Sequence, residues 1–267
     1  MGQDYFLSYL TEFFEKTPLT FKWNDYCNHA NEPVHHTAYL FAYAGKPWLA
    51  QKWSRTVMDH AYGGGVKGLC GNEDVGQMSA WYILSALGLY AVSPVDGIYI
   101  IGSPLFDEAT VQLDPHYYKG GKFTVRTRNN SARNLYVQSA ALNGKPLNRA
   151  WLRHAEVVAG GVLELVMGPQ PNESWGSALS ELPPVTSPRL SRNCTPRAWN
   201  ACAPAANDAN ISSAGDDKPS GVAAGSDGAE SLVCRWLSWR HPWPLPAFVY
   251  TVHGGRSPTA SGLETES

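Results

Sequence analysis

The spacing of apolar residues changes along this chain of 267 residues, and that change constrains the fold more than any other feature. Over residues 4–90, apolar side chains recur at steps of three and four, as Phe6, Leu10 and Phe14 do, which is the period of amphipathic helices. Over residues 92–168 the period becomes two, which is typical of strands with one buried face. The sequence therefore predicts an α+β fold in which helices precede strands.

Glycine and proline set the expected bounds of these elements. Pro18 closes the first helix, and Gly88 is a natural cap for the last one. Asn143-Gly144 is the signal for a two-residue hairpin turn. We expect helices over residues 4–17, 33–44, 48–62 and 75–87, and strands over residues 98–101, 109–113, 122–128, 136–142 and 161–167. These strands are expected to form an antiparallel sheet packed beside the helices.

Three regions follow from this change of pattern. Residues 1–91 are expected to be helical, and residues 92–176 to form the antiparallel β region. From about residue 177 Pro, Ser, Ala, Gly, Asn and Asp dominate without a sustained period. Such a segment cannot bury enough apolar surface to fold, so residues 177–267 are predicted to be a low-complexity, disordered tail.

Charge and composition exclude several classes of function. The formal net charge is −2, which gives no basic field, so we expect neither nucleic acid nor a membrane as a partner. No apolar run reaches the roughly 18 residues that span a bilayer, and the first residues lack the pattern of a signal peptide. The ten Trp suit either sugar-stacking platforms or a Trp-rich core, and composition leaves both open.

Cysteines and sequons indicate possible modifications. Five cysteines without paired spacing specify neither a disulfide framework nor a zinc site, although a bridge between Cys27 and Cys70 stays open. Four N-glycosylation sequons matter only in a protein that enters the secretory pathway. They begin at Asn129, Asn172, Asn193 and Asn210.

A first polar segment covers residues 27–36 and reads CNHANEPVHH. Asn31 and Glu32 offer the hard oxygen atoms that calcium prefers, and Pro33 suits the first turn of a helix. This stretch could therefore be half of a calcium site, or only a helix start with capping groups. The histidines do not have the spacing of a zinc protease motif, so core or surface histidines are the simpler interpretation. One of them could still hydrogen bond with a polyol hydroxyl.

A second polar segment covers residues 71–81 and reads GNEDVGQMSAW. Glu73 and Asp74 are adjacent, so their side chains cannot point the same way from one short turn. One can face a cavity while the other caps the helix or pairs with a cation, and a carboxylate aimed at water is the base of an inverting glycosidase. Alternatively, Asp74 is the N-cap of a helix with Gln77 three positions on. Two such segments in one helical region favour a shared site.

Several stretches in the right order resemble glycoside hydrolase family 92, the calcium-dependent exo-acting α-mannosidases. They are the two polar segments, YLFAYAGKPWLAQ at 39–51, SAWYILSALGLY at 79–90, IGSPLF at 101–106 and the later stretches at 129–131, 136–139 and 142–147. The resemblance covers about residues 2–176. It implies the C-terminal portion of an (α/α)6-type helical barrel, followed by the family's closing β segment.

The resemblance also implies roles for the polar residues. Asn31 and Glu32 would fall in the calcium-binding segment, and Asp74 would be the base that activates water. Asn72 falls where family members often carry Asp, and it would support the base or the pocket together with Glu73 and Gln77. The remaining candidates would bind substrate, and they are His35, His36 and Trp48.

The family's general-acid Glu lies in a part of the domain that precedes this stretch. The predicted function is calcium-dependent hydrolysis of terminal α-mannosyl linkages of glycans with inversion, impaired in this chain because the acid is missing. A missing N-terminal half is then the expected partner, besides a mannose-containing glycan. A non-catalytic carbohydrate-binding or interaction module and a non-functional gene fragment stay open as alternatives. The family resemblance suggests a secreted or periplasmic protein.

Overall fold

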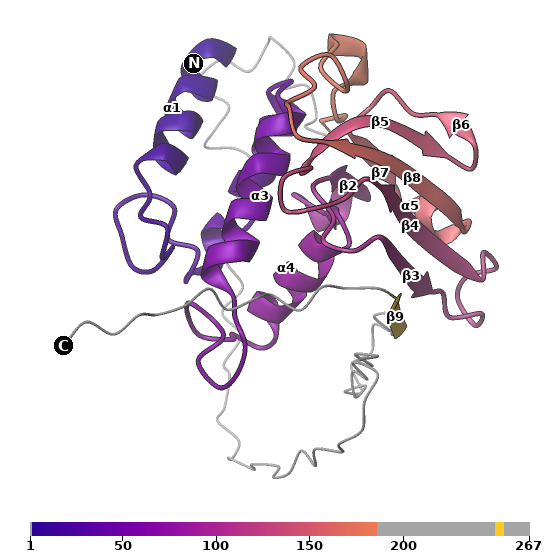
Figure 1. Ribbon diagram of the computed structural model, residues 1–267, viewed down its shortest axis with the longest axis horizontal. Coiled ribbons are helices and arrows are strands. Elements are labelled where there is room, and N and C mark those ends of the chain that lie inside the picture. Colours follow the sequence, from indigo (N-terminus) through magenta and orange to yellow (C-terminus); the bar gives the residue numbers. More distant parts are fainter. Residues whose placement is uncertain (1, 186–248, 254–267) are drawn as a thin grey trace, which may run out of the picture. The chain divides into compact units, whose positions relative to one another are not determined.

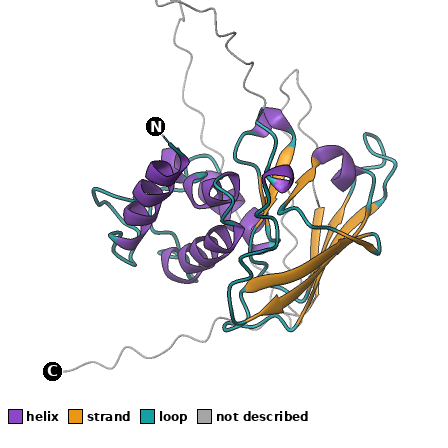
Figure 2. Cartoon of the chain, turned by 90° about the horizontal axis from the view of Figure 1, so that it is seen from above, coloured by secondary structure: helices purple, strands orange, loops and turns teal. Residues whose placement is uncertain are grey.

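Helices and strands occupy separate parts of the structure, as the change of period predicts. The structure is a computed structural model that describes residues 2–185 and 249–253. The helices of the first 90 residues lie together, and the strands that follow lie beside them (Figures 1 and 2). The described elements of both groups belong to one compact unit of the chain.

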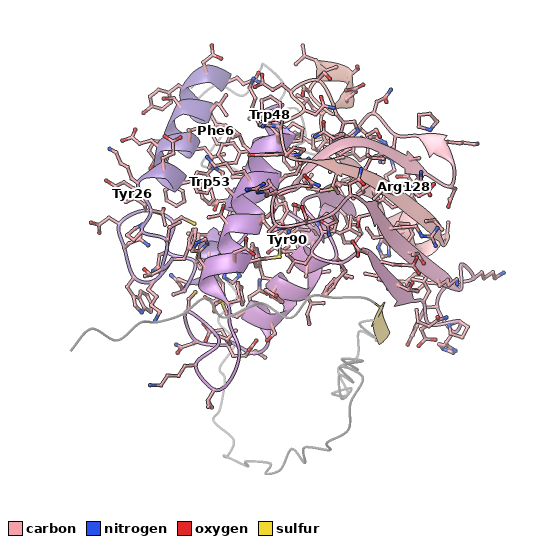
Figure 3. The ribbon with its side chains drawn as sticks, viewed as in Figure 1. Phe6, Tyr26, Trp48, Trp53, Tyr90 and Arg128 are labelled. Carbon is pink, nitrogen blue, oxygen red and sulfur yellow. The ribbon has the colours of Figure 1, made fainter. Side chains whose placement is uncertain are left out.

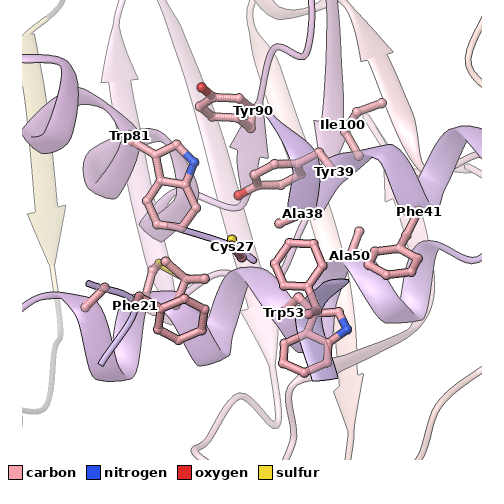
Figure 4. Packing of buried hydrophobic residues seen from close by; sticks show 14 of the residues in the cluster. Phe21, Cys27, Ala38, Tyr39, Phe41, Ala50, Trp53, Trp81, Tyr90 and Ile100 are labelled. Atoms are coloured by element: carbon pink, nitrogen blue, oxygen red, sulfur yellow. The ribbon is translucent and has the colours of Figure 1, made fainter. Parts of the chain in front are cut away.

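The helices pack through aromatic side chains. The α-helices of the described first 90 residues are α1 Gln3–Glu15, α2 Leu40–Tyr43, α3 Pro47–Ala61 and α4 Gln77–Ala86. Their apolar faces meet in one buried cluster (Figure 4). Phe14 of α1 stacks on Trp53 of α3 with ring centroids 5.0 Å apart. Such burial stabilises helices that are too short to persist alone.

The helix predicted over residues 33–44 is wrong as a single helix. Two 3₁₀ turns, η1 Glu32–Val34 and η2 Thr37–Tyr39, come before the short α2. The Thr37 hydroxyl donates to the Val34 carbonyl at 2.6 Å, and such a local bond competes with the hydrogen bonds of an α-helix. The first polar segment is therefore wound into tight turns.

The last of these helices starts two residues later than predicted. Asp74, Val75 and Gly76 have φ angles of 49°, 59° and 90°, which lie outside the right-handed helical region. α4 therefore begins at Gln77. Beyond its end Gly88 has a φ of 80°, and its amide donates to a carbonyl of the last turn. The predicted glycine cap is thus confirmed.

The strands form two sheets. The three-stranded sheet is antiparallel in the order β1-β2-β7 and consists of β1 Leu89–Tyr90, β2 Ile98–Ile101 and β7 Trp151–Arg153. The six-stranded sheet has the order β6-β5-β8-β4-β3-β9. Its strands are β3 Glu108–Gln112, β4 Lys122–Arg128, β5 Tyr136–Leu142, β6 Lys145–Pro146, β8 Gly161–Gly168 and β9 Val249–His253. Its neighbours are antiparallel at every pair except one.

That exception corrects the prediction of a purely antiparallel region. β8 runs parallel to β4 and antiparallel to β5, so it is inserted between two strands that follow each other in the sequence. Parallel neighbours need a long crossover connection, and here β5, β6, β7 and the helix α5 His154–Val158 supply it. The fold is mixed α and β with one antiparallel and one mixed sheet.

The hairpin between β5 and β6 has the predicted turn. Asn143 and Gly144 have φ angles of 51° and 75°, as a type I′ turn requires. Leu142 pairs with Lys145 directly across this turn. The Asn143 side chain also accepts a hydrogen bond from the Val162 amide at 2.7 Å, which fixes the turn against β8.

Short elements complete the described chain. η3 Pro94–Asp96 precedes β2, and η4 Leu179–Glu181 and β9 lie in the stretch predicted to be a disordered tail. The rest of that predicted tail, residues 186–248 and 254–267, lies outside the described residues. Six helix pairs would make an (α/α)6 barrel, and the described helices do not close such a ring by themselves. The barrel stays a prediction.

Two polar side chains of α3 attach the helices to the sheets. The buried Arg55 guanidinium donates to Ser103 Oγ at 3.0 Å and to the Pro104 carbonyl oxygen. Gln51 Oε1 accepts a hydrogen bond from the amide of Val137 in β5 at 3.0 Å. Buried polar groups need such partners, so these bonds tie α3 to one position against the β region.

Candidate active site

A close backbone contact brings the two polar segments together. A Cβ atom on Gly71 would lie 2.5 Å from the Ala30 carbonyl oxygen and 2.8 Å from Ala30 Cα. No side chain fits at that distance, so the contact requires glycine at this position. It places residues 27–36 beside residues 71–81, although about 40 positions separate the two segments in sequence.

Glu73 caps α4, and Asp74 does not. The Glu73 carboxylate accepts hydrogen bonds from the Ser79 amide at 3.0 Å and from Ser79 Oγ at 2.8 Å. The N-cap position belongs to Gly76 without a side-chain bond, so the predicted capping box of Asp74 and Gln77 is wrong. Of the two adjacent carboxylates, one therefore serves the helix and the other does not.

The turn that carries Asp74 is strained. Asp74 and Val75 both have positive φ, and a β-branched residue such as Val rarely adopts this conformation. Residues in such regions cost about 1–3 kcal/mol each and persist only where the surroundings enforce them, often at functional sites. Here the Glu73 cap on one side and the Gly71 contact on the other hold the turn.

Asp74 faces Glu32. The two carboxyl groups, called the carboxylate pair below, lie within hydrogen-bonding reach of each other. This hydrogen bond lowers the pKa of Glu32 and raises that of Asp74, and the negative charges of Glu32 and Glu73 raise the Asp74 pKa further. A negative charge on either carboxyl group therefore makes it harder for the other to lose its proton.

The first segment also offers no helix cap. Asn31 occupies the N-cap position of η1, and its side chain makes no capping bond. Asn31 is exposed and Glu32 is half-buried, so both can be reached from solvent. Asn72 is exposed on the turn that carries Asp74. The capping alternatives weighed from the sequence therefore account for neither Asn31 nor Asp74.

A buried hydrogen-bond network lies next to the carboxylate pair. His35 Nε2 is 3.1 Å from the His29 carbonyl oxygen, which can only accept, so this nitrogen carries the proton. His35 Nδ1 then accepts from the Gln77 amide at 3.2 Å, and Gln77 also hydrogen bonds with the Tyr90 hydroxyl. Burial lowers the pKa of His35, which keeps the imidazole neutral in this role.

Aromatic rings form the other part of this network. The His29 ring lies 4.3 Å from the Trp81 ring and 4.4 Å from the His35 ring, measured between centroids. Trp81 Nε1 donates to the His35 carbonyl at 2.8 Å. His29 and His35 are each 2% exposed and Trp81 is 1% exposed. These buried side chains therefore pack beneath the surface of the site and are not available to stack on a sugar.

The structure does not bring every predicted site residue to this place. Trp48 lies in the first turn of α3 (Figure 3), whereas Tyr62, which contacts His29 at 2.8 Å, follows the last turn. At about 1.5 Å per residue, the length of α3 separates them by roughly 20 Å. His36 is half-buried between η1 and η2 beside His35, where burial lowers its pKa.

Some residues of the site were missed by the sequence. Gly71 allows the close backbone contact with Ala30. Tyr62 and Tyr90 hydrogen bond with His29 and Gln77 of the buried network. Asn28 Oδ1 is buried without a hydrogen-bond partner, in the turn that leads to Glu32. The Gly of GNED was the one available signal, because a glycine before polar residues often marks a close approach of two backbones.

The donor atoms fit part of a hard-cation site. The carboxylate pair, the exposed Asn31 amide and the unpartnered Asn28 Oδ1 are oxygen donors of the kinds that calcium takes. Within residues 2–185 and 249–253, no three His, Cys, Asp or Glu side chains form a metal cluster. The described residues could therefore supply some of the six to eight oxygens that calcium needs.

Comparisons with known proteins identify the family. Residues 1–169 match the model of the glycosyl hydrolase family 92 catalytic domain. A protein of Arthroderma benhamiae described as an uncharacterized secreted glycosidase is 32% identical over 165 residues, which are 61% of this chain and 21% of that protein. None of the described helices is both long and apolar enough to cross a bilayer.

Solved structures agree with this match. The family GH92 α-mannosidase BT3965 of Bacteroides thetaiotaomicron is 37% identical with a TM-score of 0.64, over 70% of this chain and 24% of that one. The family GH92 inverting mannosidase BT2199 of the same species is 36% identical with a TM-score of 0.61, over 68% and 26%. The chain spans about a quarter of the length of these relatives, and it belongs to glycosyl hydrolase family 92.

Proposed function

We propose that this chain contributes the water-activating part of an α-mannosidase site, in which Asp74 is the general base. The observation that supports this most directly is that, of the adjacent carboxylates of Glu73 and Asp74, only that of Glu73 binds the start of α4. Glu73 is occupied with the helix cap, while the strained turn presents Asp74 to Glu32 and to solvent. A residue held at a cost in backbone strain, whose side chain caps no helix, is typical of a catalytic position.

The separation of the carboxylate pair decides which role Glu32 can have. In an inverting glycosidase the acid and the base are about 6.5–9.5 Å apart, because water and the sugar lie between them. Glu32 and Asp74 lie within hydrogen-bonding reach, which is too close for that pair. Glu32 is therefore not the general acid, and a ligand for a cation beside the base is the role that fits it.

The reaction would use this chain's residues as follows. Asp74, once ionised, takes a proton from a water molecule whose oxygen attacks the anomeric carbon of a terminal α-mannosyl unit. Asn72 on the same turn can orient that water but cannot accept its proton, because an amide is not a base at neutral pH. The leaving oxygen needs a proton from a general acid, and the family resemblance places that acid in the part of the domain that precedes this stretch.

Glu32 and Asn31 would hold calcium in this site. A bound calcium ion supplies positive charge that holds sugar hydroxyls and favours ionised carboxylates nearby. Glu32 would then serve as a charged ligand, and Asp74 would remain next to it as the base. His35 and Gln77 hold η1 against α4, so that the two oxygen-bearing turns keep their positions.

The substrate class rests on the relatives. The neighbours compared above are described as α-mannosidases, and BT3965 was also solved with mannoimidazole. We therefore propose a mannose-containing glycan as the substrate, the remainder of the family's domain as the partner that supplies the acid, and a location outside the cytoplasm as for the secreted relative.

The proposal is tested by calorimetry and by turnover of a nitrophenyl α-mannoside. We expect calcium to bind the chain and Glu32→Gln to weaken binding at least tenfold, because a charged ligand is lost. Glu173→Gln, an exposed carboxylate of the β region, is the control and should leave binding unchanged. Turnover by the chain alone should stay at background.

Three other results would change these assignments. Equal calcium binding in Glu32→Gln would remove the metal role of Glu32. Mannoimidazole binding without turnover, even after the upstream part of a relative is supplied, would favour a non-catalytic binding module. Rapid calcium-dependent release of mannose by the chain alone would contradict the assignment of the acid to another part of the domain.

A further inference from the structure

Two of the four sequons lie in the described chain, and their surroundings differ. Asn129 begins the sequence Asn-Asn-Ser directly after Arg128, the last residue of β4 (Figure 3). Asn172 begins the sequence Asn-Glu-Ser after β8. The proposed hydrolysis uses neither of them. The question is which side chain the fold leaves available for a covalent sugar.

The Asn129 side chain is exposed to solvent. It makes no hydrogen bond within the described residues, and its backbone has a φ of 61°, which Asn tolerates better than most residues. Its carbonyl accepts a bond from Asn134 Nδ2 at 2.7 Å, and the Asn134 amide donates to Ser131 Oγ at 3.0 Å. The turn is therefore fixed by its backbone and by neighbouring residues.

The residue after Asn129 strengthens this point. Asn130 points inward, where its Oδ1 accepts from Arg55 at 3.3 Å and its Nδ2 donates to the Phe106 carbonyl at 3.3 Å. The sequon is thus anchored on both sides of an outward-facing amide. A sugar on Asn129 Nδ2 would extend into solvent without breaking any of these bonds.

Asn172 has the opposite character. It is half-buried, and its Nδ2 donates to the Gln138 carbonyl at 2.8 Å. Its Oδ1 accepts from the Ser174 amide at 3.1 Å, from Ser174 Oγ at 2.8 Å and from the Trp175 amide at 3.3 Å. A sugar on this nitrogen would have to fit beside β5, in a place that the side chain already fills.

We propose that Asn129 is an N-glycan acceptor of the chain in a eukaryotic secretory pathway, and that Asn172 remains unmodified in the folded protein. In the reaction, Asn129 Nδ2 forms a bond to C1 of the first sugar of a lipid-pyrophosphate oligosaccharide. The bond from C1 to the phosphate oxygen breaks, the lipid pyrophosphate leaves, and the proton of Nδ2 passes to a base of the transferase. The relative described as a secreted glycosidase comes from a fungus, which has such a pathway.

The test is site occupancy in the whole chain, secreted from yeast behind a leader peptide. Glycan removal by an amidase in ¹⁸O-labelled water converts each occupied Asn to labelled Asp, and peptide mass spectrometry reads every sequon. We expect labelling at Asn129 and none at Asn172. Asn129→Asp should remove one glycan step on a gel, and Asn172→Asp should leave the pattern unchanged. Asp tolerates the left-handed conformation at position 129, so this variant keeps the turn.

Two further readouts keep the proposal open to refutation. If the chain is not secreted, translation with microsomes gives the same occupancy measurement without requiring export. Unglycosylated protein made in bacteria should keep its Tm in Asn129→Asp and lose several degrees in Asn172→Asp, which breaks a half-buried hydrogen bond. An unlabelled Asn129 in a translocated chain, or a labelled Asn172 beside it, overturns the assignment.

Discussion

At the scale of single residues, the site depends on which of two neighbouring acids is free. The sequence restricted the choice, because Glu73 and Asp74 cannot point the same way, but it could not say which one caps α4. That choice depends on the positive φ angles of residues 74–76, which no spacing rule encodes. Trp48 shows the same limit, since a helical pattern does not tell which end of α3 lies at the site.

The carboxylate pair predicts a pH effect that can be measured directly. Because Glu32 raises the pKa of Asp74, Glu32→Gln should lower the Asp74 pKa toward its ordinary value. Glu73→Gln should lower it less, because the Glu73 charge is the smallest cause of the shift. Carboxyl carbon NMR titration of the two variants tests this order. An Asp74 pKa that is unchanged in Glu32→Gln would mean that the two groups do not interact in solution.

Gly71 gives a second test at this scale. Gly71→Ala forces a methyl group against the Ala30 backbone, and overpacking of this kind destabilises a protein by roughly 1–3 kcal/mol. Gly64→Ala is the matched control, because a Cβ at Gly64 meets nothing within 4 Å. Urea unfolding should therefore separate the two variants. A similar free energy of unfolding in both would show that the two polar segments are not in backbone contact.

At the scale of elements, the sequence predicts those that carry their own signal. The strands over residues 122–128 and 136–142 have the predicted bounds because each is an uninterrupted run of strand-forming residues with glycine or asparagine near either end. The parallel pairing of β8 with β4 carries no such signal, since a period of two does not identify a partner strand. The prediction of one helix over residues 33–44 failed for another reason. A local side-chain hydrogen bond favours tight turns where the apolar spacing favoured a helix.

The start of α4 stores strain that a single substitution can release. Val75 is exposed and adopts a positive φ, so Val75→Gly should raise the free energy of unfolding by about 1 kcal/mol. Val66→Gly, at an equally exposed position without positive φ, should lower it slightly because glycine gains more freedom on unfolding. Chemical denaturation measures both. Destabilisation in Val75→Gly equal to that in Val66→Gly would contradict the strained turn.

At the scale of the whole molecule, the helical region leaves aromatic surface uncovered. Tyr5 and Tyr9 lie one turn apart on α1 and are 59% and 61% exposed, and Trp23 in the loop after α1 is 73% exposed. A groove of about 430 Å³ runs along α1 between Asp4 and Lys16, and its lining does not include the carboxylate pair. Exposed aromatic patches of this kind mark interaction surfaces. The relatives are about four times as long as the matched part of this chain, so most of their length has no counterpart in it.

This uncovered face predicts that the chain on its own associates. Tyr5 and Tyr9 present adjacent rings to solvent, and burying them against a second surface removes apolar area from water. The double variant Tyr5→Ser/Tyr9→Ser should therefore shift the sedimentation profile toward monomer and raise solubility several-fold. Tyr117→Ser, a 47% exposed tyrosine between β3 and β4, should leave both unchanged. If the upstream part of a relative is added to the native chain, it should compete with self-association, and the double variant should lose that partner as well. A native chain that sediments as a monomer at all concentrations would show that α1 needs no covering surface.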